Sequence, residues 1–178
     1  AGFDVSGARN LDADTFRASY REFLERVSAA GSDAVAAIYL SGHGVQFEGE
    51  NYFLPVGARI ARDGDIPINA IRLSDLTRPL AGQQMKTRIF VFDLAREGAP
   101  LPGGLQLAPG LQIVDPDPGS LVAFNAAPDL AAPAESGDYG AYAKALAEAM
   151  QHPRLKLDEI CDQARLCDSE LTRGRVVP

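Results

Sequence analysis

Apolar residues recur at helical spacing over the first thirty positions of the chain. On an otherwise polar segment they form one apolar stripe, which consists of Phe16, Tyr20, Leu24 and Val27. Asp12 can cap such a helix, Asp14 suits the positive end of the helix dipole, and Gly31 is typical of a helix end. The pattern predicts a helix between about residues 12 and 31.

Further along, short apolar runs alternate with helical patterns. The apolar runs lie at 34–40, 88–93 and 120–128, with a more alternating one at 50–56. The helical patterns lie at 74–82, 139–150 and 157–171. Continuous apolar runs of this length are typical of strands that are buried on both faces of a sheet. Strands alternating with helices predict an α/β domain with a mostly parallel sheet flanked by helices on both sides.

Size and charge narrow the class of protein. With 178 residues, 46% of them hydrophobic, the chain is expected to form one soluble globular domain over 1–178. We expect no membrane span, because no apolar run approaches eighteen residues.

The net charge of −7 argues against nucleic-acid binding, which needs a basic surface, and favours attraction of basic ligands. Compartment and oligomeric state stay open, and a homo-oligomer is compatible with the sequence.

The two cysteines do not predict a disulfide or a metal site. Cys161 and Cys167 are six residues apart in one predicted helix, so they project in different directions. Neither belongs to a CxxC motif. We interpret both as ordinary helix residues, and the redox compartment is not determined by them.

His43 is the residue with the clearest chemical signal. It stands between Gly42 and Gly44, directly after the apolar run at 34–40, and glycines on both sides are expected to leave open space around the imidazole. No second histidine or cysteine stands at metal-ligand spacing, because the other histidine, His152, precedes a proline at a predicted helix end. A phosphate loop is disfavoured by the lack of a lysine partner. A turn histidine bonded to the backbone is one interpretation, and a catalytic base is the other.

The second strand end completes a recognisable pattern. In parallel sheets functional residues gather at the carboxyl edge, where SGHG (41–44) and DLAR (93–96) are both expected. The segments YLSGHGVQFEGENYFLP and IFVFDLAREG resemble the p20-type core of bacterial caspase-like proteins, the metacaspases and orthocaspases of peptidase family C14. The AFNAAP strand and the last two helices are similar to the same group, so the resemblance covers nearly the whole chain. It implies the caspase–haemoglobinase fold.

The resemblance also implies a role for each residue of the site. The histidine of the Y-S-G-H-G element, here His43, is the catalytic base. Asp93 matches the acidic residue at the base of the pocket for the P1 side chain, and Ser41 matches a serine that lines it. An acidic pocket selects arginine or lysine, so the implied partner is a peptide or protein with a basic residue. The backbone N–H groups of Gly44 and Ala95 match the donors of an oxyanion hole.

The chain departs from the family at the nucleophile. The family has D-[AS]-C-R where this sequence has Asp93-Leu94-Ala95-Arg96, so alanine stands where the cysteine belongs, 52 residues after His43. A methyl group cannot form a thiolate, and the covalent mechanism is closed to the sequence as written. Cys161 and Cys167 are poor substitutes, because the family packs that helix on a sheet face.

Two explanations of Ala95 stay open. The domain is either a natural pseudoprotease that binds a peptide or protein, or an active Arg/Lys-specific peptidase in which cysteine was replaced by alanine. The neighbours Leu94 and 97–99 also differ from the usual family form, which favours the pseudoprotease. A third reading is a domain that only mediates assembly, for which Asp93 and Ser41 would be irrelevant to partner binding.

The remaining expectations concern the loop, the ends and cofactors. Residues 98–118 form a Pro/Gly-rich loop after the nucleophile strand, and loops of this length are often functional or processed. The start AGFDV does not look like a leader, and the family's first strand and helix are missing before it, so a piece of a longer polypeptide is expected. No cofactor or metal is expected, since no calcium-ligand loop of recognisable spacing is present.

Overall fold

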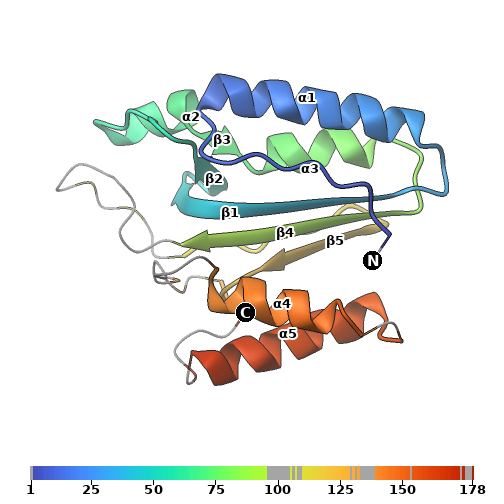
Figure 1. Ribbon diagram of the computed structural model, residues 1–178. Coiled ribbons are helices and arrows are strands. Elements are labelled where there is room, and N and C mark those ends of the chain that lie inside the picture. The colour runs from blue at the N-terminus through green and yellow to red at the C-terminus, as the bar shows by residue number, and fades with distance from the viewer. Residues whose placement is uncertain are drawn as a thin grey trace.

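The computed structural model describes residues 2–95, 105, 107, 110–128, 130, 132, 139–152, 154–172, 174 and 178. The elements follow in the order α1 (Ala13–Ala29), β1 (Val35–Phe47), β2 (Glu50–Leu54), the 3-10 turn η1 (Asp63–Asp65), α2 (Ile66–Asn69), β3 (Ile71–Arg72), α3 (Ser74–Ala81), β4 (Thr87–Ala95), β5 (Ser120–Phe124), α4 (Ala141–Ala149) and α5 (Leu157–Leu171). The strands form one sheet in the order β3-β2-β1-β4-β5 (Figure 1).

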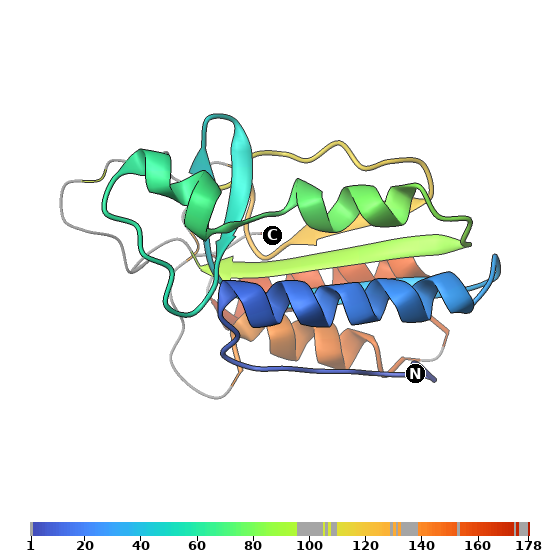
Figure 2. The same ribbon diagram turned by 90° about the horizontal axis from the view of Figure 1, so that it is seen from above.

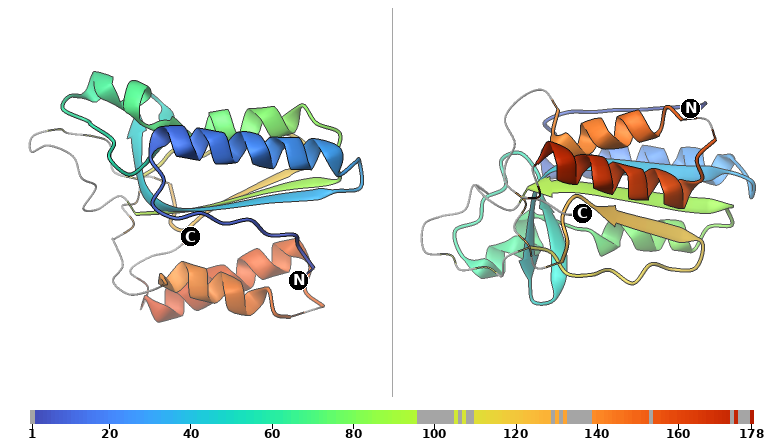
Figure 3. Two further views of the ribbon diagram at one scale, coloured as in Figure 1. Left: turned by 45° about the horizontal axis from the view of Figure 1, so that its top comes forward. Right: turned by 90° about the horizontal axis from the view of Figure 1, so that it is seen from below.

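The predicted α/β architecture is confirmed. Strands β1, β4 and β5 are parallel, and the antiparallel strands β2 and β3 extend the sheet beyond β1. Helices α1 and α3 lie side by side along one face (Figure 2), and α4 and α5 lie together on the opposite face (Figures 1 and 3). Of the loop predicted at 98–118, residues 98–104, 106, 108 and 109 lie outside the described residues. Its last part, 110–118, is irregular.

The main core lies between the sheet and the α1/α3 layer. Alternate residues of β4 point into it, namely Phe90, Phe92 and Leu94, each at most 1% exposed. The predicted stripe of α1 packs against them from above, with Phe16 in ring contact with Phe53 of β2. Burial of several large apolar side chains at one interface is the main force that holds these two layers together.

The first helix has the predicted boundaries and cap. Asp12 accepts a hydrogen bond of 2.8 Å from the Thr15 backbone N–H, and Gly31 follows the helix in a left-handed conformation with φ of 84°. Helix α5 also has the predicted bounds. In α3, Leu73 holds the N-cap position without a side-chain hydrogen bond, and the Ser74 hydroxyl donates to Glu50.

Strand β1 differs from its prediction in two ways. It does not end before SGHG but continues to Phe47, so His43 lies within the strand. It is also not buried on both faces: Val35 and Tyr39 are 39% and 48% exposed, while Ala36 and Leu40 on the other face are buried. Val35 and Tyr39 thus stay partly exposed on the face where α4 and α5 lie, whereas the α1/α3 layer buries Ala36 and Leu40 on the opposite face. In addition, β2 pairs with β1 only from His43 onward.

The two-residue turn Glu48–Gly49 explains the extension of β1. Both residues have positive φ, 48° and 80°, as a type I′ hairpin requires. This turn folds the second half of β1 back onto β2, with Phe47 facing Glu50 and His43 facing Leu54. The first half of β1 pairs with β4 instead, so one strand joins the parallel and antiparallel parts of the sheet.

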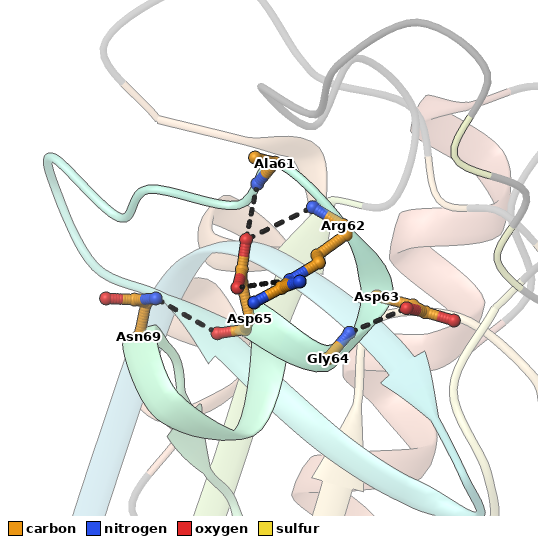
Figure 4. Close-up of polar contacts among 6 residues, drawn as sticks. All are labelled: Ala61, Arg62, Asp63, Gly64, Asp65 and Asn69. Carbon is orange, nitrogen blue, oxygen red and sulfur yellow. Dashed lines mark hydrogen bonds and ion pairs between the residues drawn. The ribbon is translucent and has the colours of Figure 1, made fainter.

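The segment between β2 and β3 contains short elements that the apolar pattern did not predict. Its turn is organised by Asp65, whose carboxylate accepts hydrogen bonds from the backbone N–H groups of Ala61 and Arg62 at 3.0 and 3.2 Å (Figure 4). The Asn69 side chain donates to the Asp65 carbonyl at 3.2 Å. The bond from Ala61 contributes most to lowering the pKa of Asp65 below its usual 3.8, against the opposing effect of burial.

Asp65→Asn is expected to lower the free energy of unfolding at neutral pH but not in acid. The folded-state pKa of Asp65 is depressed, so its stabilising contribution is present above the unfolded value of 3.8 and is lost as the pH falls through the folded value. Urea unfolding at pH 7 and at pH 3 would measure this difference, with Asp33→Asn as a control at an exposed carboxylate. A stability gap that stays the same at both values would contradict the prediction.

Candidate functional site

His43 and position 95 lie side by side at the carboxyl edge of the sheet. Strands β1 and β4 pair in parallel from Val35↔Thr87 to His43↔Ala95, which is the last pair. Paired residues of neighbouring strands are about 4.8 Å apart and point to the same face. The strand directions in Figure 1 show β1 and β4 running toward the same edge. Two residues 52 positions apart are thus placed within contact range.

The imidazole of His43 carries a buried nitrogen that lacks a partner. Its Nε2 atom is inaccessible to solvent and has no hydrogen bond to any residue that the structure describes. Buried polar atoms are nearly always hydrogen-bonded, so an unpaired one in a folded protein calls for a ligand or a functional reason. The interpretation of His43 as a turn residue bonded to the backbone is wrong, because the residue lies in a strand.

The glycines beside His43 serve the core and not the space around the imidazole. A Cβ on Gly42 would lie 2.6 Å from Cε2 of Phe53, and one on Gly44 would lie 3.0 Å from the Leu94 side chain. Both directions point to the α1/α3 face, opposite to His43, because side chains alternate along a strand. The expectation that the glycines leave open space for the imidazole is therefore wrong. They let Phe53 and Leu94 pack directly against the backbone of β1.

Gly42→Ala is expected to destabilise the fold by about 2 kcal/mol, through overpacking against the buried Phe53 ring. The φ of 157° at Gly42 adds strain for any residue with a Cβ. Chemical unfolding would measure the loss, with Gly7→Ala as the control, since nothing lies within 4 Å of a Cβ there. Combining Gly42→Ala with Phe53→Leu should recover part of the loss, and equal stability of Gly42→Ala and the unsubstituted chain would contradict the packing argument.

Two register pairs before His43 and Ala95, the sheet presents an acidic group. Ser41 and Asp93 are paired in register and share the face of His43. The Tyr39 hydroxyl donates a hydrogen bond of 2.5 Å to Oδ2 of Asp93. Burial raises the pKa of Tyr39, and the hydrogen bond and charge of Asp93 raise it further, so the phenol stays a neutral donor. The residues predicted for the P1 pocket therefore lie together, and next to His43.

The backbone at the strand end offers a donor toward the same place. In a two-residue hairpin the closing pair Phe47↔Glu50 exchanges hydrogen bonds, and hydrogen-bonded and non-hydrogen-bonded pairs then alternate. Gly44↔Phe53 falls in a non-hydrogen-bonded pair, so the Gly44 N–H points away from β2 and toward the side on which β4 ends. The other predicted donor, the Ala95 N–H, belongs to the last residue of β4.

Asn125 is a site residue that sequence reasoning missed. It follows β5 directly, is 8% exposed, and its Oδ1 accepts a hydrogen bond of 3.2 Å from the Leu94 N–H. The Asn125 N–H in turn donates to the Phe92 carbonyl at 3.2 Å. These bonds hold the end of β4 next to position 95. Strand β5 ends at Phe124, earlier than the run predicted at 120–128, and the polar residue inside that run was the available signal.

The two cysteines do not supply a replacement nucleophile. Both lie in α5 and are free thiols. Burial is the first cause that raises the pKa of each, followed for Cys161 by Asp162 and for Cys167 by Glu148. A raised pKa reduces the thiolate fraction at neutral pH, and the thiolate is the reactive form. No hydrogen bond joins either thiol to His43 in the part of the chain that the structure describes.

The described residues contain neither a cluster of metal-ligating side chains nor a membrane-spanning helix. No group of three or more histidine, cysteine, aspartate or glutamate side chains there could hold a metal ion. No helix among the described residues is long and apolar enough to span a membrane.

Comparison with known proteins agrees with the class that the fold and site define. The family model of the caspase domain, Peptidase_C14, matches residues 1–167. The chain therefore belongs to the caspase-domain family of peptidases and has the fold of a caspase-like cysteine peptidase. A search of curated proteins found no match. The closer relation to bacterial metacaspases and orthocaspases stays a prediction from the resemblance.

Proposed function

We infer that this domain binds a peptide or protein through a basic side chain without cutting it, and so acts as a pseudoprotease. The observation that carries the inference is the pair His43↔Ala95, in which a methyl group stands where a nucleophile would face the imidazole. Acyl transfer by this class of site needs an atom that attacks the carbonyl carbon while the base removes its proton. Alanine supplies neither the attacking atom nor the proton.

Recognition of a basic side chain is supported by what surrounds this pair. Ser41 and Asp93 lie two strand residues, or about 6.6 Å, away from His43 and Ala95 on the same face. A carboxylate pairs with guanidinium or ammonium groups through charge-assisted hydrogen bonds. The net charge of −7 favours the approach of basic ligands over distance.

Fluorescence anisotropy with two labelled peptides tests the proposal. One peptide carries arginine, and the other carries citrulline, a neutral isostere, at the same position. The unsubstituted chain should bind the arginine peptide more tightly, Asp93→Asn should remove the preference, and Asp115→Asn, which removes the same charge from an exposed loop, should leave it unchanged. Mass spectrometry after prolonged incubation should find the peptide intact. Equal affinity for both peptides, or a cleaved peptide, would overturn the proposal.

A second candidate function is an active Arg/Lys-specific cysteine peptidase whose nucleophile was replaced. The unpaired, buried Nε2 of His43 favours it, because a thiol at position 95 would give this atom a partner. Mass spectrometry of the protein from its native source distinguishes the two candidates. A peptide covering residues 89–96 that is heavier by one sulfur atom establishes the peptidase, and a peptide with alanine at position 95 establishes the pseudoprotease.

A further inference from the structure

Tyr39 is an exposed aromatic residue attached to the acid of the candidate site. It pairs in register with Val91, two residues before Asp93, and its hydroxyl reaches diagonally across to Oδ2 of Asp93 at 2.5 Å. Diagonal neighbours on adjacent strands are within reach of aromatic side chains. Although its hydroxyl is engaged, Tyr39 is 48% exposed. The residue therefore presents its ring to solvent beside a carboxylate.

The three odd-numbered residues His43, Ser41 and Tyr39 form a line on one face of β1. Successive members are about 6.6 Å apart along the strand. The line runs from the imidazole, past the acidic pair Ser41/Asp93, to the aromatic ring. A peptide whose backbone lies at His43 and Ala95 would direct a long side chain along this line, with its terminal cation reaching the carboxylate first and then the ring.

A second tyrosine lies near the acid, in the helical layer. Tyr142 in α4 is 5% exposed. Burial raises the pKa of Tyr142, and the neighbouring Cys161, Asp93 and Asp168 groups raise it further. Tyr142 is thus a neutral phenol near Asp93, and Tyr39 and Tyr142 together give the acid an aromatic surrounding.

We propose that Tyr39 is a specificity-determining residue for the basic side chain, a proposal that rests on the proposed function of this site. Its ring provides a face for the cation, and its hydroxyl holds the Asp93 carboxylate in place to pair with the same cation. Aromatic faces attract cations, and arginine fits best because its planar guanidinium both stacks on rings and pairs with carboxylates. The ligand class is a peptide with arginine, and secondarily lysine, at this position.

The test separates the hydroxyl from the ring. The ratio of affinities for the arginine and citrulline peptides is measured for the unsubstituted chain, for Tyr39→Phe and for Tyr39→Leu. Loss of one hydrogen bond should lower the ratio about 3-fold in Tyr39→Phe, and loss of the ring as well should lower it about 10-fold in Tyr39→Leu. The matched controls are Tyr139→Phe and Tyr139→Leu, at a tyrosine that is 62% exposed. These should leave the ratio unchanged.

Each outcome bears on one of the two proposals. If both Tyr39 variants keep the affinity ratio of the unsubstituted chain, while Asp93→Asn still loses it, the proposed role of Tyr39 is overturned. The proposed function then stands. If the Tyr39 variants lose equal affinity for both peptides, Tyr39 has a merely structural role, and its proposed role in specificity is also overturned. If the unsubstituted chain does not prefer arginine over citrulline, the proposed function itself fails. Thermal unfolding of the variants shows that each is folded under the assay conditions.

Discussion

Replacing Ala95 by cysteine is expected to turn this domain into a peptidase that cuts after arginine or lysine. The Sγ atom would stand beside the imidazole, because His43 and Ala95 are register partners on one face. His43 has an Nε2 atom without a partner among the described residues, ready to accept the thiol proton. A catalytic histidine and cysteine act as a unit, and loss of one of them removes most of the rate. Restoring the thiol should therefore raise kcat/KM for an arginine peptide by at least about 10³-fold.

Three further variants show whether the restored activity comes from this pair. Adding His43→Ala to Ala95→Cys should return the rate to that of the unsubstituted chain. Ala37→Cys places a thiol on the same exposed face of β1, away from His43, and should remain inert. Asp93→Asn in the Ala95→Cys background should lower kcat/KM for arginine peptides selectively. An Ala95→Cys chain that binds the arginine peptide but leaves it intact would contradict the proposed geometry of the pair.

The elements that the sequence predicted correctly are those whose pattern is local. The stripe of α1 and its Asp12 cap, and the bounds of α5, depend on neighbours in the same helix. Residues 36–40 and 88–92 were also placed correctly in parallel strands, since continuous apolar runs identify them. That position 95 corresponds to the nucleophile stays a prediction from the family motif, and the register places this position beside His43.

What the sequence could not predict depends on contacts between distant segments. The apolar run at 34–40 does not reveal that one face of β1 is partly exposed, because the packing of distant helices decides the burial of each face. The expectation of open space beside Gly42 and Gly44 fails for the same reason, since Phe53 and Leu94, which fill that space, come from other strands. The bond between Tyr39 and Asp93 spans 54 residues and follows only from the register.

Arg88 is a further residue whose role only the structure reveals, since nothing in the strand pattern separates it from a surface arginine. It is the second residue of β4 and is 7% exposed. Its guanidinium donates to the carbonyls of Leu80 at 2.6 Å, Ala81 at 3.4 Å and Pro118 at 3.3 Å, and to the Gln83 carbonyl. It therefore satisfies carbonyls at the carboxyl end of α3, where the helix dipole favours a positive charge. It also ties α3 to the segment that precedes β5.

Arg88→Met is expected to lower the free energy of unfolding by about 3 kcal/mol, because it keeps the apolar stem but leaves several partly buried carbonyls without donors. The stability of Arg88→Lys should lie between that of Arg88→Met and that of the unsubstituted chain. An ammonium group keeps the charge, but it lacks the guanidinium's fork geometry and cannot reach all four carbonyls. Urea unfolding measures both, and Arg59→Met, at an exposed arginine, should change stability by less than about 0.5 kcal/mol. If Arg88→Met were as stable as Arg59→Met, water would have to satisfy these carbonyls equally well. The arginine would then not be what fixes the start of β4, the strand that presents Asp93 and Ala95 at its other end.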